Sequence, residues 1–194
     1  MGNTDMIILP GSKNTTEDLL HLRECGLEAA IREQVAKGTP LWGICGGYQM
    51  LGDRILDPYH VESERDITQG LGLLPMETTL SKEKITRQVK ARAGFTFLGE
   101  TIEAENIVGY EIHAGETTFE GKYPGGVFAV IHPFTLTERG ATACAEPEGL
   151  ISNGNILGTY IHGLFDSDEL RLKLLNALLK KKGKAALAAV KNRA

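Results

Sequence analysis

The chain has few cysteines, no long apolar run and no excess of basic charge, and each shortage excludes a class of protein. Three cysteines in 194 residues cannot form a complete disulfide framework, which favours a reducing, cytoplasmic setting. No apolar run approaches the ~20 residues of a membrane span, and no signal-peptide pattern is present. The net charge of -4 gives no reason to expect nucleic acid as a partner.

Motifs that would indicate a metal or a nucleotide are also missing. The sequence has no C-x-x-C pair and no His-x-x-x-His pair, so we expect no metal site. Lys13 follows a Pro-Gly turn, but the spacing G-x-x-x-x-G-K-[ST] of a phosphate-binding loop is absent.

Cys45 is the first candidate catalytic residue. It follows an apolar run, precedes a helix-compatible segment and has glycines at positions 43, 46 and 47. A thiol on a sharp strand-to-helix turn needs such small neighbours, because the backbone there is strained and crowded. The following helix N-terminus favours thiolate over thiol, so we predict a nucleophile with a lowered pKa. The alternative is a buried cysteine acting only as a small apolar side chain.

His162 and Gly11 occupy the ends of two further apolar runs. His162 follows residues 156–161, and Gly11 follows residues 7–9. The carboxyl ends of parallel strands meet at one edge of a sheet, which would bring His162 beside Cys45. A neutral imidazole there can accept the thiol proton and return it to a leaving amine. We predict that the N–H groups of Gly11 and Gly46 hold a developing oxyanion.

The order of elements predicts an α/β fold with a mostly parallel central sheet flanked by helices. An amphipathic helix is predicted over residues 168–182, whereas residues 53–69 are polar and predict a surface loop. We expect one domain over residues 1–182 and a disordered tail over residues 183–194. The middle of the chain predicts an antiparallel or mixed extension of the sheet, with strands at residues 78–80, 86–91, 107–113, 127–131 and 142–145.

Five motifs, in this order, resemble the class I (triad-type) glutamine amidotransferases, whose fold is flavodoxin-like, and most closely the glutaminase domain of the cobyric acid synthase family. The resemblance covers residues from about 5 to about 182. The motifs lie at residues 10–15, 43–52, 70–74, 109–113 and 158–163.

The resemblance implies a function and partners. Glutamine would be hydrolysed by Cys45 and His162, with Tyr48 and Gln49 helping to seat the substrate. The ammonia would pass to an N-terminal ATP-dependent synthetase domain that amidates a cobalamin precursor, adenosylcobyrinic acid a,c-diamide, to cobyric acid. ATP and magnesium would bind on that domain, and no cofactor is expected on this one. Glu111 and His113 fall on one face of a strand and could face the reaction cleft or the synthetase domain, or else form a solvent-facing polar pair.

Two departures from the triad pattern keep alternatives open. Most triad enzymes have a glutamate two residues after the histidine, where this chain has Leu164. The imidazole could instead be oriented by Asp166, by a backbone carbonyl or by another domain. Only five residues precede the first strand, so we expect a C-terminal fragment of a longer enzyme. The alternatives are a glutaminase subunit for peptidoglycan-precursor amidation and an inactive docking module.

Overall fold

The computed structural model describes residues 2, 4–119, 126–134 and 145–188. The predicted strand over residues 142–145 and most of the predicted tail lie outside these ranges. Residues 184–188 contain no helix or strand, and the Asn176 side chain hydrogen-bonds both backbone groups of Leu187. Disorder of the tail as a whole stays a prediction.

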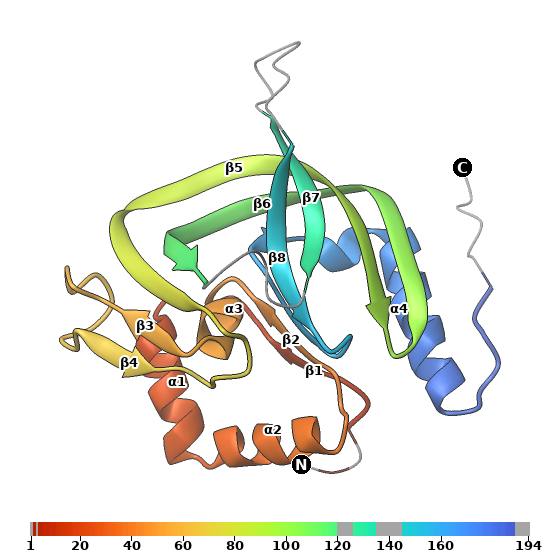
Figure 1. Ribbon diagram of the computed structural model, residues 1–194, viewed down its shortest axis with the longest axis horizontal. Helices are drawn as coiled ribbons and strands as arrows, with labels where there is room; N and C mark the ends of the chain where they lie inside the picture. The colour runs from red at the N-terminus through yellow and green to blue at the C-terminus, as the bar shows by residue number, and fades with distance from the viewer. Residues whose placement is uncertain (1, 3, 120–125, 135–144, 189–194) are drawn as a thin grey trace.

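A small parallel sheet forms the centre of the molecule. Strand β1 (Ile7–Leu9) pairs with β2 (Leu41–Ile44), and β2 pairs with β9 (Ile156–Thr159). Helices α1 (Thr15–Glu24) and α2 (Leu27–Ala36) connect β1 to β2, the helical crossover that a parallel pair of strands requires (Figure 1).

An antiparallel extension is larger than the sequence indicates. Strands β5 (Glu77–Phe97) and β6 (Glu100–Thr118) form one long hairpin that arches over the molecule (Figure 1). Its turn, Leu98 and Gly99, has φ of 51° and 83°, the left-handed pair that suits a two-residue hairpin. Strands β7 (Val127–Phe134) and β8 (Glu146–Ser152) connect β5 to β9, so one mixed sheet results.

The predicted surface loop over residues 53–69 is wrong in part. It contains strands β3 (Arg54–Leu56) and β4 (Ile67–Gln69), which pair with each other and extend the sheet beside β5. Asp57 is buried, and its carboxylate is satisfied by hydrogen bonds from the backbone N–H groups of residues 61, 62 and 63. The polar composition therefore reflects an internally bonded loop between two short strands.

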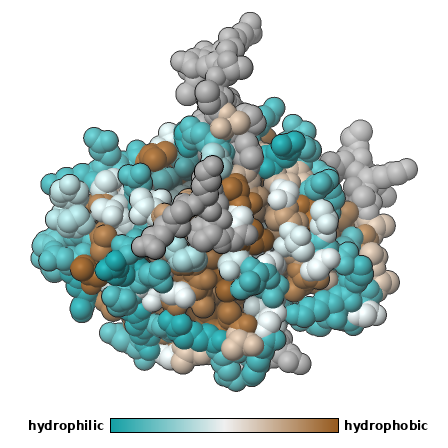
Figure 2. Space-filling model, viewed as in Figure 1, coloured by the Kyte–Doolittle hydropathy of each residue, from teal (hydrophilic) through white to brown (hydrophobic). Residues whose placement is uncertain are grey.

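Two apolar clusters hold the layers together. Trp42 packs edge-on against Phe95, Phe97 and Phe128, which joins β2 to the antiparallel extension. Helix α4 (Asp168–Lys181) begins at its cap Ser167 and buries Leu170 and Leu174 in the same cluster. The second cluster lies under α1 and α2. Figure 2 shows hydrophobic residues near the centre of this view and mostly hydrophilic residues around its rim.

Candidate active site

The turn between β2 and α3 (Gly46–Leu51) has the geometry expected of a nucleophile elbow. Cys45 has φ of 52° and ψ of -112°, a strained conformation for a residue with a side chain. A Cβ on Gly43 would lie 2.4 Å from the Gly47 carbonyl oxygen, and one on Gly47 would lie 2.1 Å from the Leu9 carbonyl oxygen. Glycine is therefore required on both sides of Cys45, as the sequence predicts.

The protonation state of Cys45 differs from the prediction. Burial raises the pKa of the Cys45 thiol, and the Gly46 N–H and the Lys84 charge only partly oppose this effect, while Glu62 adds to it. The sulfur lies 3.2 Å from the Ile112 carbonyl oxygen, to which only a protonated thiol can donate. The predicted lowered pKa is therefore wrong for this state, because loss of solvent outweighs the helix N-terminus.

His162 reaches the site by a route that the sequence did not indicate. Strand β9 ends at Thr159, the chain turns at Tyr160, and β10 (Ile161–His162) pairs antiparallel with β6. A Cβ on Gly109 of β6 would lie 2.4 Å from the His162 carbonyl oxygen, so this pairing requires glycine there. The glycine of the motif at residues 109–113 thus leaves room for β10, the strand that carries His162.

Gly11 lies next to both predicted catalytic residues, Cys45 and His162. A Cβ on Gly11 would lie 3.1 Å from His162 Cε1 and 3.6 Å from Cys45 Cβ. Gly46 donates its N–H to the Cys45 sulfur and packs against Ser12. The structure therefore gathers Gly11, Cys45, Gly46 and His162 around one small volume, although oxyanion binding by the two glycines stays a prediction.

No orienting group for His162 is found among the described residues. The ring atom Nε2 is buried and has no hydrogen-bond partner among them. Asp166, the candidate named from the sequence, is exposed, and no hydrogen bond links it to the His162 ring within the described chain. Leu164 is 1% exposed in the cluster around Trp42, so the usual position of the triad glutamate belongs here to the apolar core.

Tyr48 and Gln49 are buried by contacts within the protein. The Gln49 amide donates to the Ala114 carbonyl oxygen and accepts from the Thr15 hydroxyl. The Tyr48 ring packs edge-on against Tyr160 at 5.0 Å between centroids. This arrangement gives both side chains a structural place, and Tyr48 also lines a cleft. Their role in seating the substrate stays a prediction.

Glu111 and His113 share one face of β6, as the alternation predicts, but they do not face solvent. Glu111 bonds His113 Nε2 at 3.0 Å and Arg87 Nε at 2.5 Å, and these contacts lower the Glu111 pKa despite burial, which acts to raise it. The His113 ring stacks on Tyr160 at 3.7 Å. Both residues line a cleft of about 860 Å³ whose lining, as described, includes neither Cys45 nor His162.

Glu148 is a buried carboxyl group that sequence reasoning missed. It accepts hydrogen bonds from the Tyr160 N–H at 2.6 Å and from the Thr159 hydroxyl at 2.7 Å. Burial raises the pKa of Glu148 to about 7, and the nearby Glu111 charge adds to the effect. Burial likewise raises the pKa of Tyr160 to about 12. Since Glu148 matches no motif, only the pattern of β8 could have suggested it.

Neither a metal centre nor a membrane span is found in the described part of the chain. Its His, Cys, Asp and Glu side chains form no group of three that could hold an ion. None of its helices is long and apolar enough to cross a bilayer.

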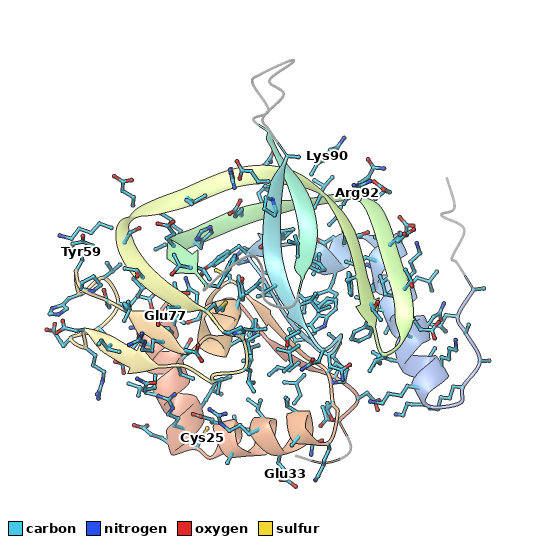
Figure 3. The ribbon with its side chains drawn as sticks, viewed as in Figure 1. Cys25, Glu33, Tyr59, Glu77, Lys90 and Arg92 are labelled. Atoms are coloured by element: carbon cyan, nitrogen blue, oxygen red, sulfur yellow. The ribbon has the colours of Figure 1, made fainter. Side chains whose placement is uncertain are left out.

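The raised Cys45 pKa predicts an order of thiol reactivity. Iodoacetamide at pH 7 is expected to alkylate Cys25 faster than Cys45, because Cys25 is exposed at the α1–α2 turn (Figure 3) while Cys45 is buried and protonated. Peptide mapping after limited alkylation measures both rates. A glutamine analogue carrying an electrophile should show the opposite preference, since it must occupy the site, and faster iodoacetamide labelling of Cys45 would contradict the protonated thiol.

The raised Glu148 pKa predicts a pH dependence of stability. The folded state holds a proton on Glu148 that the unfolded chain releases between about pH 4.5 and 7, so this stabilisation is complete at low pH and is lost as pH rises through about 7. Relative to Glu148→Gln, the free energy of unfolding of the native chain should fall by up to about 3 kcal/mol between pH 4.5 and 7.5. Denaturant unfolding at both pH values measures this difference, in which the contributions of carboxyl groups that do not interact with Glu148 cancel. A constant difference would show that Glu148 ionises normally.

Relatives of known name match nearly the whole chain. A model of the CobB/CobQ-like glutamine amidotransferase domain matches residues 1–170. A protein named cobyric acid synthase from Alkaliphilus metalliredigens is 49% identical over 187 residues, covering 94% of this chain and 36% of the relative. Another of that name, from Moorella thermoacetica, is 44% identical over 94% of this chain and 34% of the relative. The chain thus spans about a third of the length of these relatives.

Solved structures support the fold. PurLQS from Thermotoga maritima has a TM-score of 0.56 at 16% identity, covering 94% of this chain and 82% of that one. A structure described as a glutamine amidotransferase has a TM-score of 0.52 at 20% identity, covering 94% of this chain and 81% of that one. These neighbours confirm the predicted α/β fold class. Together with the matching family model, the elbow and its histidine place this chain in the CobB/CobQ-like glutamine amidotransferase domain family.

Proposed function

We propose that this chain hydrolyses glutamine to glutamate and ammonia. The Cys45 sulfur attacks the side-chain amide carbon while His162 takes the thiol proton. The carbon–nitrogen bond then breaks, His162 gives its proton to the departing ammonia, and a thioester remains. Water attacks the thioester with His162 as the base, which releases glutamate and restores the thiol. The N–H groups of Gly11 and Gly46 stabilise the oxyanion in both steps.

The observation that carries this proposal is the position of the two reactive side chains. Cys45 sits on a strained turn, and His162 flanks the same glycine, Gly11, from a different strand. A cysteine with a purely apolar role would need neither the positive φ nor the imidazole at its side. The protonated thiol makes His162 the necessary proton acceptor, rather than a helper to a thiolate that already exists.

We further propose that the ammonia serves an ATP-dependent synthetase domain located N-terminally in the same enzyme. The named relatives are about three times the length of this chain, and both are called cobyric acid synthase. The acceptor would then be adenosylcobyrinic acid a,c-diamide, with ATP and magnesium bound on the synthetase domain in the cytoplasm. These names favour a corrinoid acceptor over a peptidoglycan precursor.

Glutamate release by the chain, measured with and without the synthetase domain, tests both the proposed glutamine hydrolysis and its proposed link to that domain. Because His162 has no carboxylate partner among the described residues, we expect slow turnover alone and faster turnover with the partner. Full activity of the lone chain would contradict this dependence. An absence of glutamate under both conditions, together with no labelling of Cys45 by a glutamine-mimicking electrophile, would support an inactive docking module instead.

A further inference from the structure

We propose that Glu148 is a positioning residue for both Cys45 and His162, acting through the main chain of residues 159–161. The inference rests on the proposed glutaminase function and adds a residue to it. Glu148 lies on β8, and within the described residues its hydrogen bonds reach neither reactive side chain. Its two hydrogen bonds go to the turn that separates β9 from β10.

Glu148 fixes this turn at two consecutive residues. One carboxyl oxygen accepts the Tyr160 N–H at 2.6 Å, and the other accepts the Thr159 hydroxyl at 2.7 Å. Both bonds are buried, where hydrogen bonds to a carboxyl group are strong and their loss is costly. The turn is thereby held at a point where the strand pairing changes from β2 to β6.

The same turn connects directly to both reactive residues. The Thr159 carbonyl accepts the Cys45 N–H at 2.8 Å, which ties the elbow to the turn. The Thr159 hydroxyl also accepts the Ile161 N–H at 3.0 Å, which fixes the residue before His162. A shift of Thr159 would therefore move the Cys45 backbone and the His162 backbone relative to each other.

A local irregularity of β8 directs Glu148 inward. The next residue, Gly149, has φ of 70°, and a Cβ there would lie 2.5 Å from the Gly158 carbonyl oxygen. Only glycine tolerates both the conformation and this contact. The consequence is that Glu148 is 5% exposed, although its neighbour Pro147 lies at the surface.

The missing triad carboxylate explains why the hydrogen bonds from Thr159 and Tyr160 to Glu148 matter for catalysis. Leu164 is part of the core, and His162 Nε2 has no hydrogen-bond partner among the described residues, so within this chain the placement of the imidazole depends on the position of its main chain. A displacement of about 1 Å between reacting groups can cost about 100-fold in rate. Glu148 therefore helps to place His162, a task that the glutamate two residues after the histidine performs in most triad enzymes.

The test compares Glu148→Gln with variants of Thr159 in the full chain. The Gln variant keeps size but replaces one acceptor by a donor, and Thr159→Val removes the hydroxyl that bridges Glu148 and Ile161. We expect each to lower kcat about 10- to 100-fold with KM changed less than about twofold. Thr159→Ser keeps the hydroxyl and should retain activity. Glu146→Gln, the same substitution on the same strand, is the matched control, because Glu146 bonds Arg87 instead.

Two measurements separate positioning from general stability. Adducts of Cys45 with 6-diazo-5-oxo-L-norleucine count the folded sites, and turnover is expressed for each such site. Full turnover per labelled site in Glu148→Gln would overturn the proposal, since the loss would then reflect unfolded protein alone. A loss of equal size in Glu146→Gln would overturn it as well.

The alkylation rate of Cys45 by iodoacetamide tests the inference without glutamine hydrolysis. In Glu148→Gln and Thr159→Val, we expect the alkylation rate of Cys45 to change about tenfold while that of Cys25 stays the same. The reason is that Thr159, which is hydrogen-bonded to the Cys45 backbone, is no longer held in place. Unchanged Cys45 alkylation in both variants would refute the positioning role even if no glutamate is ever released. If Cys45 alkylation changes but the native chain never releases glutamate, the positioning role of Glu148 is supported and the proposed glutaminase function fails.

Discussion

Replacing Cys45 by alanine is expected to reduce glutamine hydrolysis by at least about 10⁴-fold. The nucleophile forms the covalent intermediate, and loss of a nucleophile that acts with its base removes nearly all catalysis by the group. Glutamate release, measured with the synthetase domain present, is the assay. The fold should survive, because the substitution keeps the Cβ that the strained backbone already accommodates.

The control for this variant is Cys25→Ala, which removes an exposed thiol at a distance from the elbow. It should hydrolyse glutamine at the native rate. Amidation driven by added ammonium salt should also persist in Cys45→Ala, because free ammonia bypasses the thioester. Substantial glutamate release by Cys45→Ala would rule out Cys45 as the nucleophile.

Replacing His162 by asparagine or alanine is expected to lower the rate about 10⁴-fold, near the upper end of what a general acid–base group supplies. The reason is the raised pKa of the Cys45 thiol, which leaves almost no thiolate at neutral pH without a base. The residual rate should rise with pH, because hydroxide then ionises the thiol directly. Rate measurements from pH 7 to about pH 10 test both statements.

His21→Ala serves as the control, because His21 is exposed on α1. It should keep the native rate and the native pH profile. A His162 variant with only a few-fold loss, and no rise of its rate with pH, would mean that another group deprotonates Cys45.

Local backbone rules made the elbow predictable from the sequence. The need for Gly43 follows from its contact with Gly47 on the same turn, although Gly47 itself is required by the more distant Leu9. Helices α1 and α3 begin and end at the residues that the sequence pattern predicts, 15–24 and 46–51. The approach of His162 was predicted as well, since β2 and β9 are adjacent and parallel. The switch of pairing at Tyr160, which brings β10 to β6, depends on Gly109, which precedes His162 by 53 positions, and has no local signal.

Electrostatic properties were the least predictable part of the site. The sequence places Cys45 at a helix N-terminus, which favours thiolate, but its burial depends on β6 lying over the sulfur. Glu148 appears in the sequence as an ordinary acidic residue of a strand. Its burial accompanies the left-handed Gly149 beside it and two donors, Thr159 and Tyr160, that lie within the histidine motif but give no sign in the sequence that they pair with position 148.

The burial of Leu164 beside Trp42 limits how this protein could be re-engineered. A designer who introduced glutamate at position 164, to copy the triad of related enzymes, would place a carboxylate inside an aromatic cluster. Burying an unpaired carboxylate costs several kcal/mol, a large share of the stability of a single domain. Conversion to a full triad would therefore first require repacking of Phe165 and α4. The single substitution Leu164→Glu is expected to destabilise the protein rather than improve catalysis.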